Sequence, residues 1–132
     1  MNKLNVEKYM QIPFVDGGRS FNGCDCRGLV GLIIKEKYSI DIPDTNVACS
    51  NHAKVDELIR SLNNWERIQK PKGILKPCIL LMQMDSPGII DHMGLFIGYG
   101  EFIHTCSKFK KPSINRIKDY LYFIEGYYAP SS

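Results

Sequence analysis

The sequence predicts an α+β domain in which N-terminal helices pack on an antiparallel β-sheet. The longer segments with helical apolar spacing lie in the first half of the chain, and the second half holds short runs rich in β-branched and aromatic residues. Helices that precede strands in this way favour two segregated layers over an alternating pattern with a parallel sheet. A chain of 132 residues has room for a single hydrophobic core. We therefore expect one domain across residues 1–132.

Three segments of the first half are expected to be helical. Residues 3–10 can form a short helix that ends before Pro13, and residues 53–65 carry apolar side chains on one helical face. The third helix begins near Cys26, with Asp25 as its N-cap. Its apolar side chains have the spacing of one buried helical face, and they are Leu29, Val30, Ile33 and Ile34.

The second half of the chain is expected to form the sheet. Residues 78–84, 90–99 and 101–106 have the composition of strands, and the tight turn between the last two predicts an antiparallel hairpin. Residues 113–119 are expected to form a short helix. The aromatic segment 122–129 then predicts a closing strand, because aromatic side chains suit a pleated surface.

Charge and hydropathy exclude several classes of function. Seventeen basic and fourteen acidic side chains leave a formal net charge of +3, which is too small to indicate a nucleic-acid-binding protein. The cluster of Lys108, Lys110 and Lys111 is most simply a solvated loop. No apolar run approaches the roughly 18 residues that a membrane span needs. The N-terminus lacks the apolar core of a signal peptide, so we expect synthesis in the cytoplasm.

Among the cysteines, Cys26 has the position of a nucleophile. Five cysteines at irregular spacing do not suit the framework of a secreted disulfide protein, so most are expected to be reduced. Cys26 lies in the first turn of a predicted helix, where unpaired amides and the helix dipole favour a thiolate. The same amides could hold the oxyanion that forms when a thiolate attacks an acyl carbon. The alternative interpretation is an ordinary buried cysteine.

Two histidines are placed to act as the base that a cysteine nucleophile needs. His92 and His104 lie on the two strands of the predicted hairpin, so they can meet on neighbouring strands. His92 shares its predicted strand face with Gly94 and Gly98, and these small neighbours would let a helix approach closely. Taken alone, each histidine is more simply a hydrogen-bonded structural residue.

These patterns together resemble a known family. The stretch PFVDGGRSFNGCDCRGLV is similar to the glycine-rich loop and the Asp-Cys-x-Gly-Leu-Val signature of the NlpC family of peptidoglycan cysteine peptidases. DHMGLFIGYGEFIHT resembles the second signature of that family, in which a histidine opens a strand and another histidine follows on the next strand. With CILLMQM between them and YFIEGYY after them, the resemblance covers nearly the whole chain in the family's order.

The resemblance implies a papain-like fold in which Cys26 is the nucleophile, His92 the general base and acid, and His104 the residue that orients His92. It also implies that the protein cleaves the amide between D-glutamate and the diamino acid of a peptidoglycan stem peptide. The stem peptide is then the expected partner, and no cofactor is expected. The loops DGGRS and IDIPDT most resemble the bacteriophage tail and prophage branch. Tail proteins are then further expected partners, and a tail or another route would deliver the protein to the periplasm or cell wall.

Four residues near the nucleophile are candidates for substrate binding: Phe14, Asp16, Asp25 and Arg27. Phe14 stands where many members of the resembled family have a tyrosine, and one such hydroxyl donor can be worth about 2.7–4 kcal/mol. Arg27 can contact a carboxylate of the stem peptide or face solvent. Asp16 can bind substrate or pair locally, and a helix cap is the favoured interpretation of Asp25.

Three other functions fit parts of the pattern. The scaffold could be a non-catalytic tail-assembly or wall-binding module, an alternative that Phe14 and the phage-like loop motivate. A zinc ion could be bound by Cys24, Cys26, His92 and His104, but Cys-x-Cys is not the usual ligand spacing, and no metal site is expected. Acyl transfer to an amine in place of water would use the same thiol.

Overall fold

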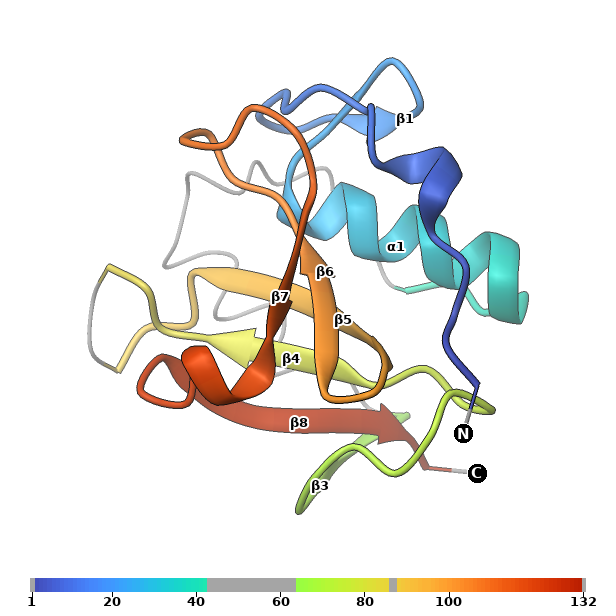
Figure 1. The fold of residues 1–132 in the computed structure, drawn as a ribbon, viewed down its shortest axis with the longest axis vertical. Helices are drawn as coiled ribbons and strands as arrows, with labels where there is room; N and C mark the ends of the chain where they lie inside the picture. Colours follow the sequence, from blue (N-terminus) through green and yellow to red (C-terminus); the bar gives the residue numbers. More distant parts are fainter. Residues whose placement is uncertain (1, 43–63, 86–87, 132) are drawn as a thin grey trace.

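The computed structural model describes residues 2–42, 64–85 and 88–131. Within these ranges one α-helix packs on one face of a six-stranded antiparallel sheet, which confirms the α+β class (Figure 1). The strand order is β3-β8-β4-β5-β6-β7, so the last strand of the chain lies inside the sheet. The strands are β3 (Trp65–Ile68), β4 (Ile79–Met82), β5 (His92–Gly98), β6 (Glu101–His104), β7 (Ser113–Arg116) and β8 (Ile124–Pro130).

The helix α1 (Cys26–Tyr38) begins and ends at residues suited to helix termini. The carboxylate of Asp25 accepts a hydrogen bond of 2.9 Å from the amide of Gly28 and caps the first turn, which confirms the predicted N-cap. Ser39 ends the helix with a left-handed backbone, at a φ of 56°, and its amide donates to the carbonyl of Lys35. The predicted apolar face is fully buried, and it consists of Leu29, Val30, Ile33 and Ile34.

The two faces of the sheet belong to separate cores. Met93 and Leu95 of β5 pack in the core that α1 covers, whereas Phe102 of β6 lies in a second core on the opposite face. A Cβ on Gly94 would lie 2.7 Å from the ring of Phe102, so this glycine makes room for an aromatic ring. The prediction that the small neighbours of His92 admit a helix is therefore wrong, because α1 covers the other face.

The predicted hairpin is confirmed with shorter strands. β5 and β6 pair antiparallel around Tyr99 and Gly100, whose φ angles of 54° and 72° are both positive. β4 pairs with the other side of β5. His92 opens β5 and His104 ends β6, so the hairpin brings both histidines to the same end of the sheet. No helix in the described part of the chain is long and apolar enough to cross a membrane.

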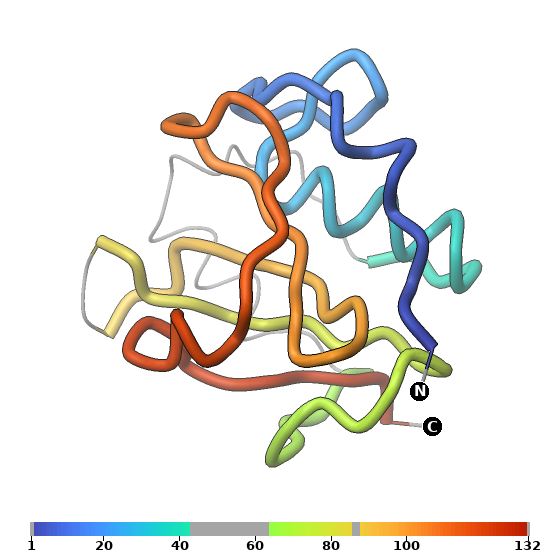
Figure 2. Tube along the Cα trace, in the orientation of Figure 1, coloured from blue at the N-terminus to red at the C-terminus, as the bar shows by residue number. Residues whose placement is uncertain are grey.

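The N-terminal segment passes β5 and α1 on its way into the domain (Figure 2). The helix expected over residues 3–10 is present only as a short 3-10 turn, η1 (Glu7–Tyr9). The amide of Leu4 donates to a carbonyl of β5 at 2.8 Å. The hydroxyl of Tyr9 donates to the Glu36 carboxylate of α1 at 2.5 Å. These contacts join the segment to both layers of the fold.

A small hairpin leads the chain into α1, where the sequence predicts only a loop. Its strands are β1 (Arg19–Ser20) and β2 (Gly23–Cys24). Phe14 forms a parallel bridge with Cys24, and the amide of Val15 donates to the carbonyl of Cys24 at 3.0 Å. The segment around Phe14 is therefore attached directly to the strand that precedes Cys26.

The structure contradicts one predicted element of the second half and shows the place of another in the sheet. Residues 113–116 form β7 beside β6, and only Ile117–Asp119 form a 3-10 turn, η2, so the helix expected over residues 113–119 is wrong. Pairing with β6 supplies backbone hydrogen bonds that so short a helix cannot match. The closing strand is present as β8, but it lies between β3 and β4. Residues 53–63 of another expected helix lie outside the described residues, and its last residue begins β3.

Candidate active site

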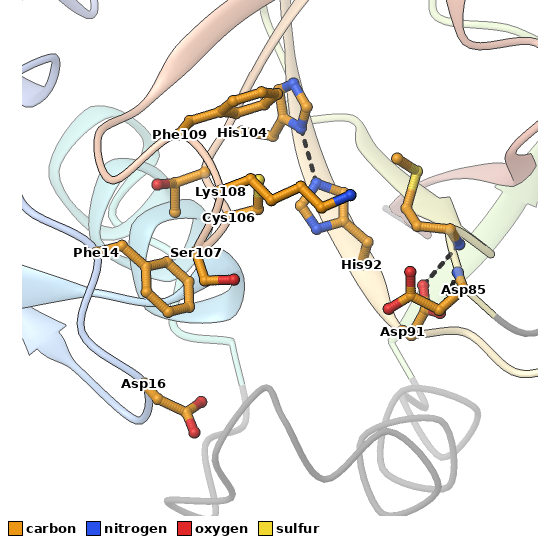
Figure 3. A pocket seen from close by; sticks show the side chains of 12 residues that line it. Phe14, Asp16, Asp85, Asp91, His92, His104, Cys106, Ser107, Lys108 and Phe109 are labelled. Atoms are coloured by element: carbon orange, nitrogen blue, oxygen red, sulfur yellow. Dashed lines mark hydrogen bonds between the residues drawn. The ribbon is translucent and has the colours of Figure 1, made fainter.

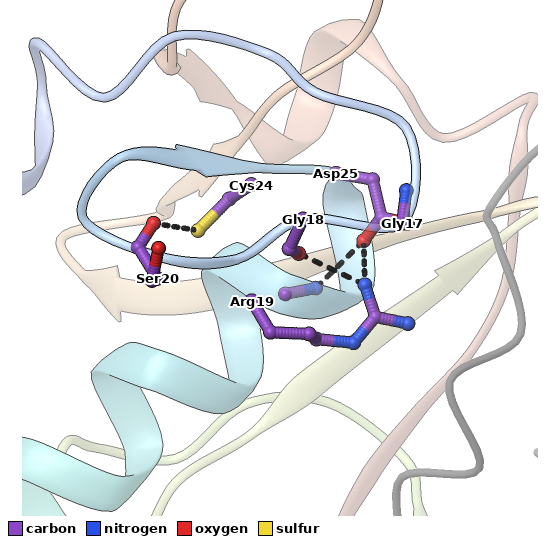
Figure 4. A network of polar contacts seen from close by, with 7 residues as sticks. Gly17, Gly18, Arg19, Ser20, Cys24 and Asp25 are labelled. Carbon is purple, nitrogen blue, oxygen red and sulfur yellow. Dashed lines mark hydrogen bonds and ion pairs between the residues drawn. The ribbon is translucent and has the colours of Figure 1, made fainter.

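One buried carboxylate holds the start of α1 in place (Figure 4). Asp25 is 0% exposed. Besides capping Gly28, it accepts a hydrogen bond of 2.9 Å from the amide of Gly17 and forms a 2.7 Å ion pair with Arg19. Cys26 follows as the first residue of α1 and is only 1% exposed. The cap and the ion pair thus fix the backbone next to the candidate nucleophile.

The loop before α1 covers the first turn of the helix because Gly28 has no side chain. A Cβ at this position would lie 2.0 Å from the carbonyl oxygen of Gly18. No backbone oxygen can come so close to a methyl group, so any other residue would push the loop away. The glycine-rich stretch therefore serves packing at this point, directly beside Cys26.

Two of the other cysteines have the environment of inert thiols. Burial raises the pKa of Cys24 to about 11 and that of Cys78 to about 12, so both are protonated at neutral pH. The Cys24 thiol also donates to the carbonyl of Ser20 at 3.1 Å. Cys106 is partly exposed. Among the cysteines that the structure describes, Cys26 alone begins a helix.

The two histidines are joined at the end of the β5–β6 hairpin. Nε2 of His92 lies 2.7 Å from Nδ1 of His104 (Figure 3). The His104 ring is packed among three aromatic rings, with centroid distances of 4.7 Å to Phe102, 5.4 Å to Tyr120 and 5.8 Å to Phe109. This packing holds the His104 ring in one orientation, with its Nδ1 against Nε2 of His92.

Burial keeps both histidines neutral at pH 7. It lowers the pKa of His92 to about 3, and the nearby His104 contributes to this lowering. Burial also lowers the pKa of His104, against the effect of a hydrogen bond with Asn115. A neutral imidazole has one nitrogen that can accept a proton. Because Nε2 of His92 faces His104, Nδ1 is the nitrogen left for proton exchange with a thiol.

A cavity of about 570 Å³ opens beside the histidine pair. This volume suits a short peptide or a molecule of similar size. Its wall carries carboxylates together with one amine, so a ligand with both charges could be bound. The lining residues are Phe14, Asp16, Met84, Asp85, Asp91, His92, His104, Thr105, Cys106, Ser107, Lys108 and Phe109 (Figure 3).

The structure brings some of the sequence-predicted residues together and separates others. Phe14 and Asp16 line the cavity with both histidines. Asp25, Cys26 and Arg27 lie at the start of α1 and are not part of that lining. Arg27 instead lines a second cavity of about 260 Å³, along α1. Within the described ranges, no three His, Cys, Asp or Glu side chains are grouped as metal ligands would be.

Three polar residues at the site are absent from the sequence-based prediction. Asn115 contacts the histidine pair, but its segment has the pattern of a helix, so nothing in the sequence indicated this contact. Asp91 accepts hydrogen bonds from the amides of Met84 and Asp85 at 2.7 and 2.8 Å, and so shapes the cavity wall. Thr105 is 1% exposed, and its hydroxyl has no hydrogen-bond partner among the described residues. For Asp91 and Thr105, the only available signal was their position directly beside His92 and His104 in the sequence.

A comparison with protein families identifies the chain. The model described as the NlpC/P60 family matches residues 11–123, which is most of the sequence. The chain belongs to the NlpC/P60 family. Members of the NlpC/P60 family are cysteine peptidases, and the family includes peptidoglycan hydrolases of the cell wall. The family resemblance drawn from the sequence is therefore confirmed.

Solved structures of other NlpC/P60 proteins share the fold. The NlpC/p60 domain of the peptidoglycan hydrolase SagA is 20% identical with a TM-score of 0.60, over 96% of this chain and 92% of that one. NlpC1 from Trichomonas vaginalis is 18% identical with a TM-score of 0.68, over 92% of this chain. An NlpC/P60 family protein from Bacillus cereus ATCC 10987 is 22% identical with a TM-score of 0.63, over 90% of this chain.

The chain spans 40% of the length of the Trichomonas protein and 35% of the Bacillus protein. No curated protein matches the chain.

Proposed function

We propose that this chain is a peptidoglycan cysteine peptidase in which Cys26 is the nucleophile, His92 the general base and acid, and His104 the residue that orients His92. The observation that carries the proposal is the 2.7 Å contact of the two buried histidines at the wall of the large cavity. Membership of a family of cysteine peptidases supports it. We also propose that residues 1–132 form one such domain, which the match over residues 11–123 supports.

The reaction would begin with transfer of the Cys26 thiol proton to Nδ1 of His92. The thiolate attacks the carbonyl carbon of the amide, and the amides at the start of α1 stabilise the resulting oxyanion. His92 then returns its proton to the amide nitrogen, the C–N bond breaks, and an amine leaves. Water attacks the remaining thioester while His92 accepts its proton. Release of the carboxylic acid restores the thiol.

The bond proposed for cleavage is the amide between D-glutamate and the diamino acid of a stem peptide. A stem peptide carries both carboxylates and an amino group near that bond. The cavity offers the carboxylates of Asp16 and Asp85 for the amine and the ammonium group of Lys108 for a carboxylate. This distribution of charge supports a zwitterionic peptide as the substrate class.

A digest of purified peptidoglycan tests this activity. Muropeptides from a wild-type digest should contain the cleaved stem peptide, identified by mass spectrometry, and Cys26→Ala should give none. Cys106→Ala is the matched control, because Cys106 lines the same cavity but does not begin a helix. If the muropeptides from wild-type and Cys26→Ala protein are the same, the proposal is wrong.

A second candidate function is a binding module without turnover. Two observations favour it: Cys26 is almost completely buried, and Phe14 brings no hydroxyl to the cavity. Iodoacetamide labelling at neutral pH, followed by peptide mapping, separates the two functions. An activated Cys26 should react faster than an unactivated thiol such as glutathione, whereas a rate no higher than that of glutathione would favour the binding module.

We further propose that a phage tail carries the protein to the cell wall. The support is the resemblance of the loop at residues 16–20 to tail and prophage proteins. Particles purified after prophage induction of the source strain should then contain the chain in amounts stoichiometric with tail proteins. Recovery of the chain only outside the particles would contradict this setting.

A further inference from the structure

A chain of polar contacts runs across three neighbouring strands from the histidine pair. It passes from His92 on β5 to His104 on β6, and from Nε2 of His104 to Oδ1 of Asn115 on β7 at 2.8 Å. At its end, the hydroxyl of Ser113 donates to the same Oδ1 at 2.8 Å. Nothing in the proposed chemistry assigns a role to the β7 end of this chain.

The register of β6 and β7 explains why Asn115 reaches His104. His104 pairs directly with Ser113, and Phe102 pairs with Asn115. Side chains on directly paired residues, and on residues two apart, share one face of a sheet. Asn115 is therefore the diagonal neighbour of His104.

The direction of each hydrogen bond in this series of contacts follows from the carboxamide of Asn115. A carboxamide oxygen can only accept, so Nε2 of His104 must carry a proton and donate it to Asn115. A neutral imidazole carries one N–H, so Nδ1 of His104 is an acceptor. Nε2 of His92 must then be the donor in the contact between the histidines. Nδ1 of His92 is consequently without a proton.

We propose that Asn115 is a positioning residue that selects the ring tautomers of His104 and His92, and so makes Nδ1 of His92 a proton acceptor. The inference rests on the proposed function, because it assigns that nitrogen to the reaction with Cys26. A donor at position 115 would reverse every bond in the chain and leave Nδ1 of His92 protonated. In the orientation that the structure shows, the hydroxyl of Ser113 donates to the same Oδ1, so this oxygen is the acceptor for both of its neighbours.

The first experiment measures the tautomers directly. In ¹H–¹⁵N correlation spectra of uniformly ¹⁵N-labelled protein at pH 7, both histidines should carry their proton on Nε2. Asn115→Leu removes the acceptor at similar size, and it should give His92 a substantial population of the Nδ1–H form. Asn115→Asp keeps an acceptor and should preserve the wild-type tautomers. A wild-type His92 with its proton on Nδ1, or unchanged tautomers in Asn115→Leu, would overturn the inference.

The second experiment measures turnover of peptidoglycan fragments. Asn115→Leu should lower kcat by about 100-fold, the scale of general base catalysis, with KM changed less than twofold. Asn115→Asp should retain activity, and the acidic limb of its kcat/KM profile should move to higher pH, because a carboxylate raises the pKa of the histidines. Ile114→Val is the control for β7, because Ile114 packs in the α1 core and should keep wild-type activity.

The outcomes distinguish the inference from the function on which it rests. One outcome is that wild-type protein cleaves no peptidoglycan while the Asn115 variants change the tautomers as expected. In that case the proposed function is wrong, and the inference that Asn115 selects the histidine tautomers is retained. If the protein is active and Asn115→Leu loses only as much kcat as Ile114→Val, the inference is wrong. Circular dichroism of each variant separates these results from a loss of folding.

Discussion

The start of α1 and the strip formed by β5, β6 and β7 both hold buried groups of the proposed site, but they do so by different means. At α1, a charged carboxylate binds the loop, Arg19 and the first helical turn around Cys26. On the strip, hydrogen bonds join the neutral side chains of His92, His104 and Asn115, and the proposal concerns which atom of each pair donates. The first arrangement fixes a backbone position, and we propose that the second fixes where a proton resides.

The difference teaches that substitutions on the two sides should have different effects. Removing a charge at α1 should cost folding stability, because an ion pair and a cap are lost together. Removing a neutral group on the strip should cost catalysis more than stability. Four predictions test this contrast, in order of decreasing effect.

The largest effect is expected from His92→Ala on the strip. Without the proposed general base, kcat/KM for peptidoglycan fragments should fall by about 10³-fold. Turnover and thermal unfolding of wild type and His92→Ala would be compared. Retention of more than a tenth of the wild-type activity would contradict the assignment of His92 and shift the search to another base.

At the start of α1, Asp25→Ala should lower the free energy of unfolding by about 3 kcal/mol or more, because it strips a buried carboxylate from its partners. Asp25→Asn retains the cap on Gly28 but loses the charge, so its loss should be smaller. Urea denaturation measures both. A loss within about 0.5 kcal/mol for Asp25→Ala, the range of ordinary surface changes, would remove the proposed contrast between the two regions.

Low pH should lower the folding stability that the buried, neutral His92 contributes. The pKa of His92 is about 3 in the folded chain and near 6.5 when unfolded, so between these values the unfolded chain binds more protons. Stability from the neutral histidine is fully present above pH 7 and is lost as pH falls through 6.5 toward 3, by on the order of a few kcal/mol. His92→Gln should flatten the dependence of the urea midpoint on pH between 7.5 and 4.5. Parallel curves for the two proteins would refute this source of acid sensitivity.

The smallest effect is expected from Phe14→Tyr. Phe14 lines the cavity with the histidines, and its backbone is bridged to the strand before Cys26. A hydroxyl there would add one donor to the site, and a fully aligned oxyanion donor is worth about 100-fold or more in kcat. A donor added to a wall that has not adapted to it should supply only part of this, so kcat should rise by about tenfold. Phe14→Leu is the size control without a hydroxyl. Equal kcat values for Phe14→Tyr and wild type would show that the hydroxyl does not reach the reacting atoms.

Much of the fold could be predicted because its signals are local. The N-cap Asp25, the apolar face of α1 and the turn at Tyr99 and Gly100 each follow from a few adjacent residues, and all three are present. Residues 113–116 were misjudged because their strand conformation depends on pairing with β6. Likewise, the aromatic composition of β8 indicated a strand but not its neighbours, which are β3 and β4.

The residues of the candidate site also differ in whether local sequence signals could indicate them. Cys26, His92 and His104 could be singled out from motifs, because helix starts and hairpins are short-range features with recognisable residues. Asn115 could not, since its contact with His104 exists only through the register of two strands.

By itself, the sequence determined the family, the capped helix that begins at Cys26 and the hairpin that carries both histidines. The family is recognised from short motifs, and the capped helix and the hairpin depend on interactions between residues close together in the chain. The tertiary structure alone decided which face of the sheet α1 covers, which residues line the cavity, and that His92, His104 and Asn115 lie in contact across three strands. Those features depend on packing and strand register between distant segments, and local sequence patterns carry no record of either.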